Sequence, residues 1–111
     1  MRKVGIVGLG MTPFKSKWAT KTYYALAQMA AKEAFRDAGL CPKEVDSVVF
    51  TIYNDIFERT AIPEHPLQGI VGMMNKPGLR VTNGGATGGY GLRAAFAEVA
   101  SGLSDTVMVL G

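Results

Sequence analysis

The 111-residue chain is poor in the residues that build metal centres and disulfide frameworks. It contains one cysteine, Cys41, and one histidine, His65. A single cysteine excludes a disulfide within the chain, and a structural zinc site would need more cysteine and histidine ligands than the sequence offers. A chain without disulfides suits a reducing compartment, so we expect a cytoplasmic location. His65 stands in a proline-flanked loop, where a lone histidine is usually solvated, and we interpret it so.

Charge and long apolar runs are also scarce. Charged residues make up 19% of the chain, the net charge is +3, and the nearest approach to a basic cluster is Lys15, Lys17 and Lys21. Nucleic-acid binding needs a concentrated basic stripe, so we interpret these lysines as solvated surface and expect no nucleic-acid partner. A membrane-spanning helix needs about 20 consecutive apolar residues, and no run approaches that length. We therefore expect no membrane span.

Apolar and small residues, in contrast, are plentiful, with 48% hydrophobic residues and 14 glycines. This composition predicts one globular domain. The unbroken apolar run Val4–Leu9 predicts a strand buried on both faces. A helical period follows from Thr22 to Ala38, with Thr22 as its cap and Gly39 in the left-handed position after its end. The β-branched and aromatic run Asp46–Tyr53 predicts the second strand.

The C-terminal half continues the alternation of strand and helix. Strands that alternate with helices predict an α/β fold with βαβ connections, a parallel or mixed sheet, and a small-residue helix buried against it. The last strand would leave an uncovered sheet edge, so we expect the chain to be incomplete and to need either its own continuation or a partner chain. The expected elements are a loop at 54–66, a short helix at Leu67–Met74, a third strand at Leu79–Asn83, a helix from Ala86 to Ser101 ended by Gly102, and a fourth strand at Thr106–Leu110.

One glycine cluster follows the first predicted strand. Gly5, Gly8 and Gly10 resemble part of a dinucleotide-binding fingerprint. However, Pro13 occupies the place of its third glycine, and no helix opens there. We therefore interpret this cluster as a turn where the backbone closely approaches a neighbouring element.

A second glycine cluster lies between the third strand and the small-residue helix. A phosphate loop would need lysine followed by serine or threonine after its glycines, and Tyr90 and Gly91 stand there instead. We expect Gly88, Gly89 and Gly91 to let the helix pack closely against its neighbours.

The start of this cluster leaves two interpretations open. Gly84 and Gly85 could form a plain turn, or an open pocket floor whose backbone N–H groups face a ligand. Asn83 could cap the helix at Ala86 or line that pocket.

These residues resemble the nucleophile segment of the thiolase superfamily, whose pattern is Asn-x-Cys-Ala-Ser/Thr-Gly. Asn83, Ala86, Thr87 and Gly88 match the pattern, and Gly85 occupies the position of the cysteine nucleophile. The segment thus resembles a thiolase site without its thiolate.

Three further segments resemble the same superfamily, in its archaeal and sterol-carrier-type branch. Val4–Gly10 with Thr12-Pro13-Phe14 is similar to its first strand and loop, Ala38–Asp46 to its AGL-x-P-x-x-[IV]-D connection, and Ser101-Gly102-x-x-Asp105 to the segment after the nucleophile helix. The resemblance covers essentially the whole chain. It implies that residues 1–111 are the N-terminal portion of a thiolase-like N-terminal domain, truncated at its fourth strand, and so an incomplete half of a five-layered thiolase-like fold.

The resemblance also implies a substrate and a site. Acyl-CoA thioesters would be the substrates, with no further cofactor, and the substrate-binding residues would be Asn83, Gly84, Gly85, Ala86 and Thr87. No catalytic nucleophile is implied, because Gly85 stands in its place. The closer analogues are cysteine-free members of the superfamily that act as aldolases. We therefore expect carbon–carbon cleavage or formation of the retro-aldol type in the complete protein, and no activity from this chain alone.

Two alternatives remain open at this point. The chain could belong to a conventional thiolase acyltransferase of the acetyl-CoA acetyltransferase type, completed by another chain, or it could be a non-catalytic subunit of a heteromeric thiolase-like complex. The resemblance further implies a role in lipid metabolism, a homo- or hetero-oligomer formed through the Leu79–Asn83 strand, and a small zinc-containing partner subunit as a candidate.

Overall fold

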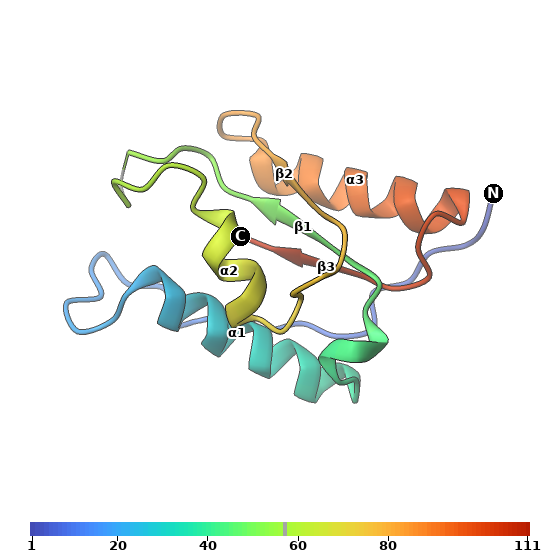
Figure 1. Cartoon of the computed structure of the whole chain (residues 1–111), viewed down its shortest axis with the longest axis horizontal. Helices are drawn as coiled ribbons and strands as arrows, with labels where there is room; N and C mark the ends of the chain where they lie inside the picture. Colours follow the sequence, from blue (N-terminus) through green and yellow to red (C-terminus); the bar gives the residue numbers. More distant parts are fainter. Residues whose placement is uncertain (57) are drawn as a thin grey trace.

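A computed structural model describes residues 1–56 and 58–111, and in it a parallel sheet lies between helices (Figure 1). Two longer helices, α1 and α3, flank the sheet, and a shorter helix, α2, packs beside α1. The elements are α1 (Tyr23–Ala38), a 3₁₀ turn (Pro42–Glu44), β1 (Ser47–Thr51), α2 (Glu64–Ile70), β2 (Gly78–Val81), α3 (Thr87–Ser101) and β3 (Val107–Leu110). No helix of this described part is long and apolar enough to cross a bilayer.

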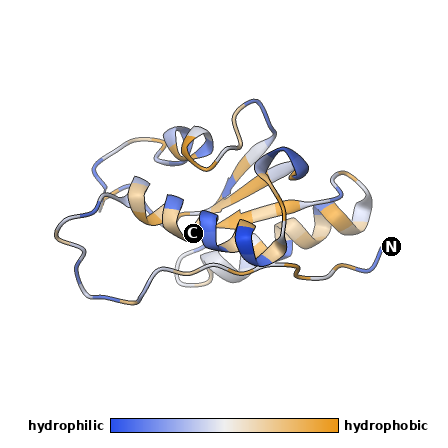
Figure 2. Cartoon of the chain, turned by 90° about the horizontal axis from the view of Figure 1, so that it is seen from below, coloured by the Kyte–Doolittle hydropathy of each residue, from blue (hydrophilic) through white to orange (hydrophobic). Residues whose placement is uncertain are grey.

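The sheet has the order β2-β1-β3, and both pairings of β1 are parallel. Alternate residues of β1 face opposite layers: Val48 and Phe50 pack in the core with α1 and α2, whereas Thr51 faces Gly91 of α3. Both layers cover β1, because Val48, Val49 and Phe50 are at most 1% exposed. Figure 2 shows the apolar residues concentrated on the strands in the middle of the molecule. The predicted α/β fold with a parallel sheet is confirmed.

Local signals set both ends of α1, as predicted. The Thr22 hydroxyl accepts a hydrogen bond from the backbone N–H of Ala25 at 3.2 Å. Gly39 follows the helix with a φ of +68°, a conformation that costs glycine little. The buried side of the helix includes Ala31 and the partly buried Phe35.

The predicted first strand at Val4–Leu9 is wrong, because this segment forms no strand. The central strand β1 already pairs with β2 on one side and β3 on the other, so it offers no free edge. Most of the apolar side chains of the segment therefore remain in solvent, and Ile6 and Leu9 are 73% and 70% exposed.

The same segment runs along α1 instead. The backbone N–H of Leu9 donates to Asp37 Oδ2 at 2.9 Å. A Cβ atom at Gly8 would lie 2.6 Å from the Cβ of Ala38, and one at Gly10 would collide with the backbone of Ala30. The predicted close backbone approach at these two glycines is therefore confirmed, with α1 as the neighbour.

The helix predicted at Leu67–Met74 lies three to four residues earlier, at Glu64–Ile70. Pro63 with Glu64 in the first turn favours this start, and Gly72, with a φ of +82°, follows its end. The loop predicted at 54–66 correspondingly ends before Glu64, and its position 57 lies outside the described residues. His65 lies exposed on the helix.

The carboxylate of Asp46 holds the start of β3, since Oδ2 accepts from the backbone N–H groups of Asp105 at 2.8 Å and Thr106 at 3.0 Å. These bonds, first that from Thr106, hold the pKa of Asp46 below its ordinary value of 3.8. A lowered folded-state pKa stabilises the fold above the unfolded pKa, and this contribution disappears as pH falls through the folded-state value. Asp46→Asn should therefore cost about 0.5–1 kcal/mol at pH 7, since Asp46 is exposed to screening solvent.

Urea unfolding from pH 7 down to pH 2 would measure this effect. The difference in unfolding free energy between the wild type and Asp46→Asn should shrink as the pH falls below 4. A difference that stays constant over this range would contradict the role of the charge. Glu33→Gln is the control, because it removes an exposed carboxylate that accepts no backbone hydrogen bond among the described residues.

Candidate functional site

The turn between β2 and α3 gathers the residues predicted to bind substrate. It is closed by a hydrogen bond from the backbone N–H of Ala86 to the carbonyl of Asn83, at 3.0 Å. Gly84 has a φ of +50°, which favours glycine at this point of the turn. Because β1 and β2 are parallel, their carboxyl ends lie at the same end of the sheet, where α3 also begins (Figure 1).

The hydroxyl of Thr87 organises this turn. It accepts a hydrogen bond from the backbone N–H of Asn83 at 2.8 Å and donates to the carbonyl of Gly84 at 2.7 Å. Thr87 is 5% exposed. The helix cap, Ala86, has no side-chain cap bond, so the predicted capping of the helix by Asn83 is wrong. Instead, the Thr87 hydroxyl in the first turn of the helix connects the backbone groups of Asn83 and Gly84. The Asn83 side chain is exposed.

Gly85 lies in open space. A Cβ atom built there would have no heavy atom within 4 Å, and its backbone is outside the left-handed region. Within the described residues, no acceptor pairs with the backbone N–H groups of Gly85, Gly88 and Gly89. Free N–H groups at the positive end of a helix favour a negatively charged or polarised oxygen. The two interpretations of Gly84 and Gly85, a plain turn and an open pocket floor, therefore both remain open.

The predicted packing role of the helix glycines holds at one position only. Gly91 is buried, and a Cβ atom there would collide with Thr51 and lie 3.5 Å from Val109 Cγ1. Gly88 and Gly89 are exposed, with nothing within 4 Å of a Cβ atom, so the packing interpretation is wrong for both in this structure. They lie on the side of α3 turned away from the sheet.

Removing the Thr87 hydroxyl should loosen the turn. Thr87→Val keeps the shape of the side chain but leaves a backbone N–H and a carbonyl without this partner, so we expect a loss of about 1 kcal/mol in unfolding free energy. The amide of Asn83 should exchange its hydrogen faster with solvent, as measured by NMR. Thr82→Val is the control, because the Thr82 hydroxyl also bonds a backbone carbonyl, that of Ile52, at an exposed site. Unchanged exchange at Asn83 would contradict the organising role of Thr87.

A buried network that the sequence analysis missed fixes α3 against the sheet. The carboxylate of Glu98 accepts hydrogen bonds from the hydroxyls of Ser47 at 2.5 Å and Ser104 at 3.1 Å. Ser47 is 2% exposed and opens the apolar strand β1. The sequence does contain a signal for this network, namely a serine at the start of an apolar strand. A buried hydroxyl needs a hydrogen-bond partner. The network sets the position of the helix whose first turn forms the site.

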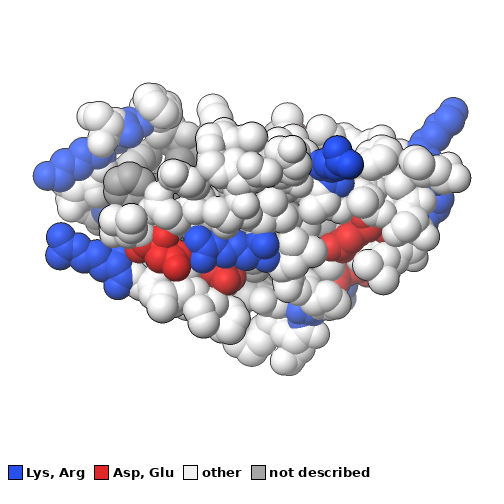
Figure 3. Space-filling model, turned by 90° about the horizontal axis from the view of Figure 1, so that it is seen from above, with Lys and Arg blue, Asp and Glu red and all other residues white. Residues whose placement is uncertain are grey.

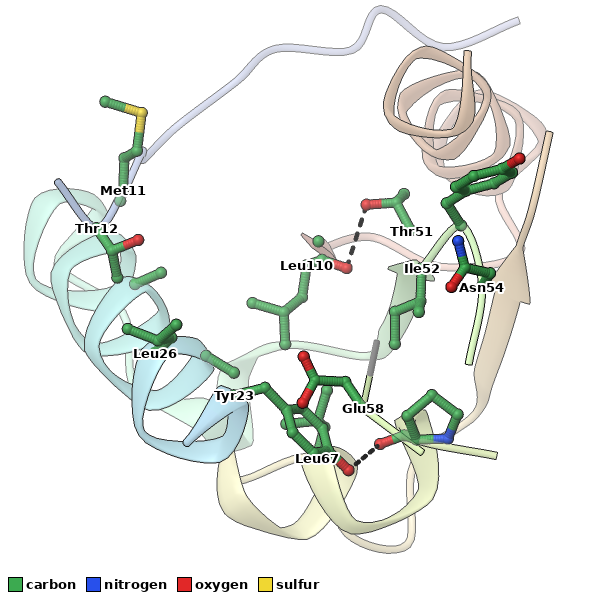
Figure 4. A pocket seen from close by; sticks show the side chains of 16 residues that line it. Met11, Thr12, Tyr23, Leu26, Thr51, Ile52, Asn54, Glu58, Leu67 and Leu110 are labelled. Atoms are coloured by element: carbon green, nitrogen blue, oxygen red, sulfur yellow. Dashed lines mark hydrogen bonds between the residues drawn. The ribbon is translucent and has the colours of Figure 1, made fainter. Parts of the chain in front are cut away.

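A second candidate site is a cavity of about 440 Å³ between α1, the segment after β1 and the end of β3 (Figure 4). Leu26, Leu67 and Leu110 supply apolar walls, while Tyr23 and Glu58 supply polar groups. Burial, with a contribution from Tyr24, raises the pKa of Tyr23 to about 12. The Tyr23 phenol therefore stays protonated at neutral pH and can donate, as it does to the carbonyl of Pro63 at 3.5 Å.

Charged groups around these sites do not form a cluster of metal ligands. No group of three or more His, Cys, Asp and Glu side chains comes together among residues 1–56 and 58–111. Figure 3 shows Lys and Arg side chains scattered among uncharged residues on one face, without a continuous stripe. The described turn and cavity are thus sites for hydrogen bonding and apolar contact.

Comparison with known proteins places the chain in a family. The thiolase N-terminal domain matches residues 4–111. An acetyl-CoA acetyltransferase of Methanocaldococcus jannaschii is 35% identical over 117 residues, covering 100% of this chain and 28% of that protein. Human sterol carrier protein 2 is 30% identical over 113 residues, covering 100% of this chain and 20% of that protein. The chain spans less than a third of the length of these relatives.

A solved structure is similar in fold as well. The structure titled Ltp2-ChsH2(DUF35) aldolase superposes with a TM-score of 0.70 and 26% identity, covering 94% of this chain and 26% of that one. The fold of this chain therefore corresponds to about a quarter of a longer protein chain.

Proposed function

We propose, from the premise that this chain belongs to the family of thiolase N-terminal domains, that its complete form binds an acyl-CoA thioester at the 83–87 turn and makes or breaks a carbon–carbon bond without an enzyme thiolate. The observation that carries the proposal is Gly85. It occupies the nucleophile position of the family pattern, with Asn83, Ala86 and Thr87 in place around it. Open space surrounds Gly85, so packing does not impose glycine there.

The turn offers electrostatic stabilisation without covalent capture. In a retro-aldol cleavage, a base removes the proton of the β-hydroxyl, the Cα–Cβ bond breaks as a carbonyl forms, and the released enolate takes a proton to give a shorter thioester. Backbone N–H groups at the positive end of α3, such as those of Gly85 and Gly88, suit the developing enolate oxygen. We assign the acid and the base to no residue of this chain.

A second candidate function is conventional thiolysis, with the nucleophile supplied by another chain. The name of the archaeal relative, acetyl-CoA acetyltransferase, favours it. It differs from the first proposal in requiring a covalent acyl intermediate, which this chain has no residue to form at position 85.

The proposal includes partners. The solved aldolase is titled as a pair, Ltp2 with ChsH2(DUF35), and a small zinc-containing subunit is our candidate partner for this protein. The edge strand β2 is our candidate for an oligomer contact, because its outer side pairs with no strand among the described residues and Leu79 is 41% exposed. Mass and metal analysis of the native complex would test both.

An assay of the native assembly separates the candidates. We expect a 3-hydroxyacyl-CoA to yield a carbonyl compound and a shorter acyl-CoA, with no mass increase on this chain after incubation with substrate. Thiolysis of a 3-oxoacyl-CoA through an acylated chain would contradict the aldolase proposal and support conventional thiolysis. The third possibility is a supporting role in a stable heteromer. In that case, a variant with a blocked turn, such as Gly85→Trp, should replace this chain without loss of turnover.

A further inference from the structure

Three lysines that the sequence analysis interprets as solvated surface line one pocket in the fold. Lys15, Lys17 and Lys21 line a hollow of about 510 Å³ beside the start of α1, together with Trp18. Glu58 is the one acidic residue in its lining. We call this hollow the lysine pocket; its remaining lining residues are Ser16, Thr22, Tyr23, Tyr24, Leu26 and Thr60.

The ammonium groups of this pocket are available to a ligand. The Nζ atom of Lys15 lies 4.1 Å from the ring centroid of Trp18, a cation–π contact that a stronger anionic partner can replace. Within the described residues, Lys15, Lys17 and Lys21 form no ion pair with a carboxylate. Three positive charges against one negative charge leave the pocket with an unbalanced positive field.

The first turn of α1 adds to this field. The helix has 16 residues and carries no acidic side chain in its first turn. Thr22 caps the N–H of Ala25, and the N–H groups of Tyr23 and Tyr24 meet no acceptor among the described residues. The positive end of the helix dipole thus points to the same hollow as the lysines.

We propose that the lysine pocket binds the phosphates of a nucleotide, with the base stacking on Trp18 after Lys15 moves to a phosphate. This inference rests on the proposed function, because the nucleotide end of a CoA thioester carries such phosphates. The segment 15–24, which supplies most of the pocket lining, and the 83–87 turn both lie at the end of the sheet toward which β1 and β3 point (Figure 1).

Adenosine 3′,5′-bisphosphate tests the pocket without a thioester or a pantetheine arm. Trp18 is the only tryptophan of the sequence, so its fluorescence reports binding directly. We expect saturable binding that weakens at least about tenfold when Lys15, Lys17 and Lys21 are all changed to glutamine. It should also weaken when salt is raised, because the phosphates are bound by charge. Removing the one opposing charge by Glu58→Gln should tighten binding about twofold.

The control changes the same charge elsewhere. A variant with Lys3, Lys32 and Lys43 replaced by glutamine loses three exposed lysines outside the pocket and should bind within about twofold of the wild type. Equal weakening in the two triple variants, or no binding to the wild type, would overturn the inference. Inorganic phosphate that competes as strongly as the bisphosphate would overturn its nucleotide part.

The same titrations keep this inference separate from the proposed function. Acyl-CoA binding that is equal in the wild type and in Lys15→Gln/Lys17→Gln/Lys21→Gln would refute the pocket and leave the thioester proposal standing. The opposite outcome is bisphosphate binding that depends on the lysines, while the native assembly neither binds nor turns over any acyl-CoA. That outcome would support the pocket and refute the thioester proposal.

Discussion

Replacing Gly85 with cysteine should give the chain a reactive thiol that captures an acyl group from a CoA thioester. The site has room for the side chain, and the backbone needs no left-handed conformation. A thiol beside the N-terminus of α3 should have a lowered pKa, because the helix dipole favours the thiolate. In a Cys41→Ser background, we expect Gly85→Cys to react with a disulfide reagent at pH 7 at least about tenfold faster than an ordinary exposed cysteine.

The comparison needs an ordinary cysteine in the same protein. Lys32→Cys, on the exposed side of α1 away from either helix terminus, provides it in the same Cys41→Ser background. Intact-mass measurement after incubation with acetyl-CoA should show an acetyl adduct on Gly85→Cys only. A thiol that reacts no faster than the control would contradict the electrostatic description of the turn. Fast reaction with the disulfide reagent but no acyl adduct would count against thioester binding at this site.

The parts of the fold that the sequence predicts correctly depend on neighbours in the chain. Thr22 and Gly39 mark the ends of α1 because a cap and a left-handed terminator act on adjacent backbone groups. The strand predicted at Val4–Leu9 depends instead on a partner strand far away in the sequence. Both edges of β1 are paired with β2 and β3, and the segment lies along α1 rather than along the outer edge of β2 or β3. An apolar run shows that a segment prefers burial, but it does not identify the strand that will pair with it.

In the candidate sites, too, the sequence predicts local features and misses contacts between distant residues. Gly85 could be located from the sequence, because the residues on both sides of it match a pattern. The role of Thr87 was not predicted, since the pattern gives the residue but not the two backbone groups that its hydroxyl joins. Tyr23 and Glu58 are 35 positions apart and meet only at the wall of the cavity. Side chains brought together by the fold leave no periodic or local signal.

Adding one methyl group to α3 should change the stability of the fold in opposite directions on the buried and the exposed side of the helix. Gly91→Ala places a Cβ atom against the side chain of Thr51 and close to Val109, at a point where helix and sheet are in contact. Overpacking of this kind costs about 1–3 kcal/mol, which exceeds the gain of up to about 1 kcal/mol that alanine brings to a helix. We therefore expect a net loss of stability in urea unfolding, with the helix displaced from the sheet at its N-terminal turns.

Gly89→Ala is the matched control, because it makes the same change two residues earlier in the same helix. A Cβ atom there meets nothing within 4 Å, so the helix preference of alanine should act alone and raise the unfolding free energy by about 0.5–1 kcal/mol. The two variants should thus shift the urea midpoint in opposite directions. Equal shifts would mean that Thr51 and Val109 yield without cost. In that case close packing would not explain glycine at position 91, and its place beside the site would need another cause.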